Sequence, residues 1–119
     1  MSDMRLGEYT MPAARLGKED PLPPLDGCLP YALQNDYDRE RVPRGFRTAV
    51  LENDRLRAVF LLELGGRLWS LFDKKRGREL LYVNPVFQPA NLALRNAWFS
   101  GGVEWNMGVF GHSVFTCSP

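Results

Sequence analysis

The chain has 119 residues, a size that suits one domain able to bury roughly two thirds of the surface of the unfolded chain. Its net charge of +1, from 15 basic and 14 acidic side chains, gives no electrostatic footprint for nucleic acid or an anionic membrane. No apolar run is long enough to cross a bilayer and the N-terminus lacks a signal-peptide core, so a cytoplasmic location is predicted.

The two cysteines, Cys28 and Cys117, lie far apart, and neither has a second cysteine or a histidine at metal-ligand spacing. We therefore expect no metal site and no cofactor. In the predicted cytoplasmic location both thiols are expected to be reduced.

Residues 1–45 carry most of the prolines and show neither a helical nor a strand period. Because proline lacks an amide donor and fixes φ, this segment is predicted to be an extended, Pro-rich N-terminal arm without regular structure. Apolar side chains spread through it would pin the arm along a sheet, so that it wraps the domain formed by residues 46–119.

From Phe46 onward the sequence predicts an antiparallel meander of four strands, at residues 47–52, 55–64, 67–73 and 79–83. Asn53 and Asp54 tolerate positive φ and suit a tight hairpin between the first two strands. Gly65 and Gly66 interrupt an apolar run, which predicts a bulge or a close backbone approach. Residues 74–77 are expected to form the next turn.

The stretch from Ala58 to Leu62 is apolar at consecutive positions, which predicts that this strand is covered on both faces. Residues 84–89 contain two prolines and should leave the sheet, and residues 91–96 are expected to form one helical turn. The predicted fold class is therefore all-β, an antiparallel β-sandwich. Because a second sheet is missing, the chain is expected to be an incomplete N-terminal portion with exposed apolar surface.

Residues 97–112 combine aromatic, polar and glycine residues in a way that is costly to keep in a plain core. Trp98, Trp105, Glu104, Asn106 and His112, the only histidine, lie among four glycines that let the backbone turn sharply or approach a ligand. Aromatic planes beside a few fixed polar groups are typical of a pocket for a polyhydroxylated ring. The alternative interpretation is that the tryptophans are core residues packed over a bulge, as is also expected of Trp69 and Tyr82.

Glu104 and His112 are the candidate acid/base couple for opening a cyclic sugar hemiacetal. Glu104 and Asn106 would project to one face of a regular strand, with His112 returning through a glycine-containing loop. Two structural alternatives remain for Glu104, a carboxylate bonded to loop amides or a charge-assisted pair with Arg95.

Five stretches resemble known families. Residues 51–57, 63–74 and 77–82 resemble the opening strands of the galactose mutarotase-like β-supersandwich. Leu29-Pro-Tyr-Ala-Leu and Ala97-Trp-Phe-Ser-Gly-Gly-Val-Glu-Trp-Asn, followed by Gly-His, resemble a bacterial domain family of unknown function found N-terminal to tetratricopeptide repeats in long cytoplasmic proteins. The resemblance covers residues 29–119.

The resemblance implies a carbohydrate-related role, because the superfamily contains sugar epimerases and accessory domains of glycoside hydrolases. This sequence departs from the family at Asn96, where glycine is usual, and at His112, where many members have a histidine pair. Catalysis in mutarotases uses a histidine and a distant glutamate, so a glutamate beyond Pro119 would leave the site here incomplete.

Three hypotheses follow from the sequence and the resemblance. The domain either processes carbohydrate through Glu104 and His112, or binds it through Arg95, Trp98, Trp105 and Asn106 without turnover. The third is a non-catalytic interaction module that packs on C-terminal tetratricopeptide repeats of the same chain or on a partner protein.

Overall fold

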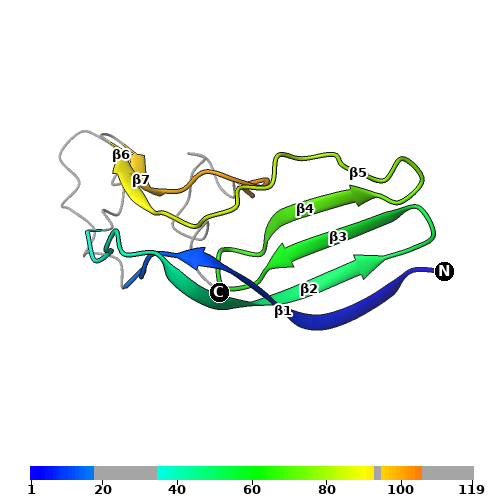
Figure 1. Cartoon of the computed structure of the whole chain (residues 1–119), viewed down its shortest axis with the longest axis horizontal. Helices are drawn as coiled ribbons and strands as arrows, with labels where there is room; N and C mark the ends of the chain where they lie inside the picture. The colour runs from blue at the N-terminus through cyan, green and yellow to red at the C-terminus, as the bar shows by residue number, and fades with distance from the viewer. Residues whose placement is uncertain (18–34, 93–94, 106–119) are drawn as a thin grey trace.

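The computed structural model describes residues 1–17, 35–92 and 95–105, and every regular element in these residues is a strand. Five strands form an antiparallel sheet in chain order, and two more pair as a separate hairpin (Figure 1). The predicted all-β class is confirmed, and the arrangement is consistent with a β-sandwich. The strands are β1 (Asp3–Ala13), β2 (Val42–Glu52), β3 (Leu56–Leu61), β4 (Arg67–Asp73), β5 (Arg78–Glu79), β6 (Ala90–Leu92) and β7 (Arg95–Trp98).

The hairpin predicted between β2 and β3 is confirmed, and the side chain of Asn53 closes it. The Asn53 amide donates to the carbonyl of Leu56 at 2.9 Å. Its side-chain Oδ1 accepts hydrogen bonds from the amides of Arg55 at 2.8 Å and Leu56 at 2.9 Å. A short polar side chain that bonds the backbone two and three residues ahead holds the turn without tertiary help.

The turn predicted at residues 74–77 is also present and uses the same device. Asp73 Oδ1 accepts hydrogen bonds from the amides of Lys75 at 2.9 Å and Arg76 at 3.0 Å. Gly77 then adopts a φ of 62°, a conformation that glycine takes without steric cost. The backbone hydrogen bond from Arg76 is the largest of several interactions that lower the pKa of the Asp73 carboxyl.

The predicted position of the bulge was wrong. Gly65 and Gly66, with φ of 66° and 61°, lie in the turn between β3 and β4. The register shift in this hairpin falls instead between Val59 and Phe60, and β3 ends at Leu61, three residues before the predicted end. Two consecutive glycines therefore mark the change of direction here and not an irregularity inside a strand.

The prediction that residues 1–45 lack regular structure was wrong for residues 3–13, which form β1, and for residues 42–45, which begin β2. β1 pairs with β2 along its whole length, from Asp3 opposite Glu52 to Ala13 opposite Val42. Pro12 lies opposite Pro43, and the Pro12 carbonyl bonds outward to the amide of Phe87 at 3.0 Å. Since the backbone of Pro12 faces away from β2, its missing amide removes no bond from the ladder.

Residues 84–89 leave the sheet, as predicted, and cross to the edge strand β1. The amide of Phe87 donates to Pro12, and the amide of Ala14 donates to the Phe87 carbonyl at 2.9 Å. The helical turn predicted over residues 91–96 was wrong, because β6 and β7 form a hairpin there. This hairpin lies at the end of the sheet opposite the β2–β3 turn (Figure 1).

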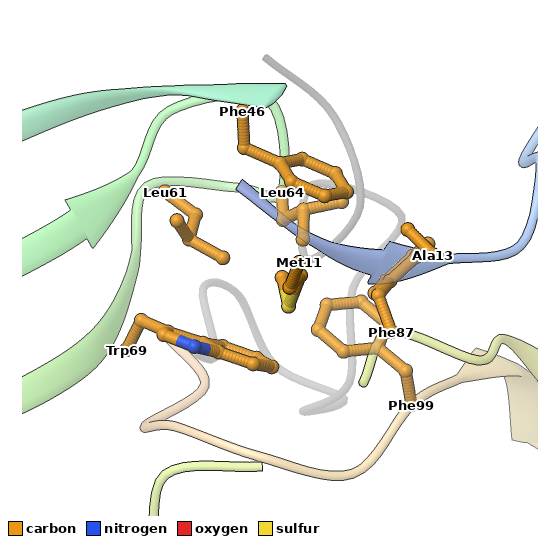
Figure 2. Close-up of a cluster of buried hydrophobic side chains, with 8 residues drawn as sticks. All are labelled: Met11, Ala13, Phe46, Leu61, Leu64, Trp69, Phe87 and Phe99. Carbon is orange, nitrogen blue, oxygen red and sulfur yellow. The ribbon is translucent and has the colours of Figure 1, made fainter. Parts of the chain in front are cut away.

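The core lies on one face of the sheet and joins strands to the crossing segment (Figure 2). Phe87 contacts Phe46 and Phe99 edge to face, with ring centroids 5.5 and 4.9 Å apart. Trp69 is fully buried, as expected of a core residue, whereas Tyr82, also expected in the core, is 73% exposed. The core side chains are Met11, Ala13, Phe46, Leu61, Leu64, Trp69, Phe87 and Phe99.

The part of the chain that the structure describes contains no helix with the length and apolar character needed to cross a membrane. Within the same residues, no group of three or more His, Cys, Asp or Glu side chains could hold a metal ion.

Glu52 links β2 to β1 and to the turn after β4 through two ion pairs, and this predicts a stability effect at low pH. Its carboxylate lies 2.6 Å from Lys74 Nζ and 2.6 Å from Arg5 Nη2. These hydrogen bonds, with that of Lys74 the larger, lower the pKa of Glu52 from 4.5 to about 2. A carboxyl with a lowered pKa in the folded state stabilises the fold above its ordinary pKa, and this contribution disappears as the pH falls from 4.5 towards 2.

We therefore expect the melting temperatures of the wild type and of Glu52→Gln to differ at neutral pH and to converge as the pH is lowered through this range. Thermal unfolding of both proteins at a series of pH values measures the difference. Asp73 is present in both proteins, so its own titration cancels. A difference that stays constant down to pH 2 would contradict the role of the Glu52 carboxylate.

Candidate functional site

The structure describes the side chains of two of the six candidate site residues, Glu104 and Trp105. The backbones of Arg95 and Trp98 lie in β7, but their side chains lie outside the described residues, as do Asn106 and His112. The expected couple of Glu104 with His112, and the shared face of Glu104 and Asn106, therefore stay predictions.

The two glycines before Glu104 serve close packing within the domain. Gly101 and Gly102 have φ of 117° and 69°. A Cβ atom on Gly101 would lie 2.8 Å from Cη2 of Trp69, and one on Gly102 would lie 2.5 Å from the carbonyl oxygen of Leu68. The expectation that these glycines leave room for a ligand was wrong, because the Trp69 ring and the β4 backbone occupy that room.

Further hydrogen bonds hold residues 99–105 along β4. The amide of Val103 donates to the carbonyl of Leu68 at 2.8 Å, forming an isolated antiparallel bridge. Asn84 Nδ2 donates to the carbonyl of Ser100 at 3.0 Å. Trp105 Nε1 donates to the carbonyl of Gly66 at 2.7 Å, and the Trp105 side chain remains 44% exposed. Residues 99–105 therefore lie alongside β4 and are held there by these hydrogen bonds.

Arg67, at the start of β4, is the residue around which this segment is built, and sequence reasoning missed it. It is only 3% exposed. Its Nη1 donates to the carbonyls of Phe99 at 3.2 Å and Gly101 at 2.9 Å, and its guanidinium lies 3.8 Å from the centroid of the Phe99 ring. An arginine can make all of these contacts because its planar guanidinium carries several N–H donors and a flat face that stacks on aromatic rings.

Glu104 forms an ion pair with this buried arginine. Its Oε2 lies 3.8 Å from Arg67 Nη2, and the Glu104 side chain is 15% exposed. Glu104 is therefore paired within the domain through Arg67, whereas the predicted pair with Arg95, whose side chain lies outside the described residues, stays a prediction. Arg67 precedes the buried Trp69 by two residues, and residues two apart in a strand point to the same face of the sheet. This spacing is the feature of the sequence that could have indicated that Arg67 faces the core.

A cleft of about 350 Å³ lies beside the core but away from this segment. Phe46, Leu64 and Phe87 contribute to its apolar wall, and Arg15 and Arg44 are among its polar lining residues. Neither Glu104 nor Trp105 lines it. The described candidate residues and the cleft are therefore separate features.

Comparison with solved structures finds a similar fold within a larger protein. A TPR-domain containing protein from Parabacteroides distasonis ATCC 8503 has a similar structure, with a TM-score of 0.78 and 26% sequence identity. The similarity covers 99% of this chain and 21% of the Parabacteroides chain. This chain thus spans about a fifth of the length of that protein.

A family model also matches most of the sequence, including the segment built around Arg67. The matching model describes a domain of unknown function, DUF5107, and the match runs over residues 23–119. The chain belongs to the DUF5107 family of domains of unknown function.

Proposed function

We propose that the domain is a non-catalytic interaction module that docks, through the outer face of its five-stranded sheet, on tetratricopeptide repeats of the same polypeptide. The outer face is the side of the sheet opposite the core. The apolar character of this face is the observation that carries the proposal. Its members are Met4, Leu6, Ala49, Leu51, Leu56, Ala58, Phe60 and Leu71.

The strand register identifies the outer face as one continuous surface. Residues directly opposite in antiparallel strands point to the same side, so Met4, Leu51, Ala58 and Leu71 form one row across four strands. In β2 these outward positions alternate with the buried Phe46, Thr48 and Val50.

The outer face is apolar, and several of its side chains are open to solvent. Met4 is 71% exposed, Leu6 74% and Leu51 44%. An antiparallel sheet with one solvated face ordinarily places polar residues there, whereas apolar positions on both faces are typical of a sheet covered on both sides. A contiguous exposed apolar surface marks an interaction site.

The similar structure supports repeats as the occupant. It is described as a TPR-domain containing protein, and four fifths of its chain lie outside the region similar to this one. Tetratricopeptide repeats stack as helix pairs that offer extended surfaces for contacts with neighbouring elements.

The packing of the residues that were expected to bind sugar also favours a module without turnover. Two groups expected to meet a sugar are already engaged within the domain, Glu104 with Arg67 and the indole nitrogen of Trp105 with Gly66. The glycines beside them pack on Trp69 and β4. We therefore do not propose carbohydrate processing as the leading function.

Thiol labelling of the full-length polypeptide tests whether the outer face is covered. With Cys28 and Cys117 replaced by serine, Leu6→Cys should react with a maleimide about tenfold more slowly than Tyr82→Cys, the factor given by a docking free energy of about 1.4 kcal/mol. Tyr82 is a matched control because its side chain is 73% exposed and lies outside the sheet. Equal rates would refute docking.

A photo-crosslinking residue at position 56, on the outer face of β3 and away from the β1 edge, identifies what covers the face. Crosslinks are expected to repeat helices of the same polypeptide. Crosslinks to a second copy, or to a non-repeat segment, would assign the outer face to another occupant and overturn the proposal.

A further inference from the structure

We propose that two copies of this domain pair through the outer edge of β1, antiparallel and in a register centred on Met4, so that their two sheets become one. The inference concerns the backbone edge of the sheet and not the side chains of its outer face, although Met4 and Leu6 belong to both, and it does not require docking on repeats. It rests on the exposure of β1, on the direction of its backbone groups and on its charges.

β1 is an edge strand whose first half is uncovered. The sheet order begins with β1, which pairs with β2 on one side. The six residues from Asp3 to Glu8 are exposed at every position, on both faces of the sheet. The opposite edge strand, β5, has only two residues, so β1 offers the longer described edge.

Contacts at the far end of β1 show which backbone groups face outward. The carbonyl of Pro12 and the amide of Ala14 bond to Phe87 on the outer side of the strand. Because β1 pairs with β2 without a register shift, backbone groups alternate regularly along it. The amides and carbonyls of Met4, Leu6 and Glu8 therefore point to the open edge.

The first half of β1 lacks three of the devices that protect an edge, and its charged residues are of both signs. Proteins keep edge strands from pairing by shortening them or by placing charged residues, especially lysine, or proline or a bulge in them. Residues 3–8 contain no lysine, no proline and no register shift. Such an edge is suited to accept another strand by main-chain hydrogen bonds.

The charges of β1 favour a second copy as the added strand. An antiparallel pair related by a two-fold axis and centred on Met4 places Asp3 of each copy directly opposite Arg5 of the other. At the centre of the pair, Met4 of each copy then exchanges backbone hydrogen bonds with Met4 of the other. Leu6 of each copy forms backbone hydrogen bonds at the two ends of the pair. Opposite charges directly across a strand pair stabilise it, and the symmetric pairing is closed, so it uses up both edges.

Proline at position 6 tests the pairing without disturbing the fold. The amide of Leu6 points outward, so Leu6→Pro removes a donor from the dimer while leaving the β1–β2 ladder intact. In the full-length polypeptide, sedimentation equilibrium should show a dimer for the wild type and a monomer for Leu6→Pro. The unfolding midpoint of the two proteins should match when measured at concentrations where both are monomeric.

Charge exchange tests the register. Asp3→Arg should weaken dimerisation about tenfold, because two attractive pairs become repulsive. Asp3→Arg combined with Arg5→Asp should restore the dimer, and the loss of the Arg5–Glu52 ion pair within each copy is measured separately by the unfolding midpoint of the monomer. Leu51→Lys, on the outer face, should leave it unchanged. A monomeric wild type, a dimer that survives Leu6→Pro, failure of the charge exchange, or dissociation by Leu51→Lys would each overturn the proposal.

Discussion

Replacing Trp69 with alanine is expected to lower the free energy of unfolding by about 3–5 kcal/mol, the cost of removing a large aromatic side chain from a packed core. Trp69 is fully buried, and the edge of its ring lies where a Cβ atom of Gly101 would be. Its loss removes the surface against which residues 99–102 pack. Denaturant unfolding at equilibrium measures the change.

Two other variants separate the size of the ring from its chemistry. Trp69→Phe is expected to cost less than Trp69→Ala, because a smaller ring still fills part of the space. It also removes a buried indole N–H that has no acceptor among the described residues, and such a group is itself destabilising by about 1–3 kcal/mol. Tyr82→Ala, at a 73% exposed position, should change stability by less than about 0.5 kcal/mol. A Trp69→Ala protein as stable as Tyr82→Ala would contradict the core assignment.

The elements that could be predicted from the sequence are those closed by local chemistry. The β2–β3 hairpin is fixed by Asn53 through bonds to residues two and three positions away, and the β4–β5 turn by Asp73 and Gly77 in the same way. Side chains that act within one turn leave a signal that composition and spacing reveal.

β1 could not be predicted because half of it is exposed on both faces. Strand alternation appears in a sequence only where one face is buried, and in β1 this holds only from Tyr9 to Ala13. Pro12 also argued against a strand here, because proline is rare in strand interiors. Its position is tolerated because Pro43 and Phe87 lie on either side of it, which depends on a register set far along the chain.

The packing of the segment around Gly101 and Gly102 could not be predicted for the same reason. The positions that require glycine, Gly101 and Gly102, stand out in the sequence, whereas the groups that fill the space beside them come from β4. Likewise, nothing local to Arg67 indicates that its hydrogen-bond acceptors are the carbonyls of Phe99 and Gly101. A charged residue in a strand is predicted to be exposed unless the groups that pair with it in the core are known.

Replacing Arg67 with methionine is expected to lower the free energy of unfolding by about 3–5 kcal/mol, because a partner of a buried ion pair is removed and the other charge remains. Methionine keeps much of the apolar volume of the side chain. The carbonyls of Phe99 and Gly101 lose a donor, and the Glu104 carboxylate, 15% exposed, loses its cation. Denaturant unfolding measures this cost, as for Trp69.

Glu104→Gln is expected to cost less, about 1–3 kcal/mol, because Arg67 keeps its two carbonyl acceptors and the glutamine keeps the shape of the side chain. The double variant should be more stable than the sum of the single effects implies, with a coupling of about 0.5–3 kcal/mol. Strictly additive effects, or a Glu104→Gln protein as stable as the wild type, would mean that the 3.8 Å pair does not hold the segment. The ion pair with Arg67 would then no longer speak against the ligand role predicted for Glu104, and carbohydrate binding would have to be tested again.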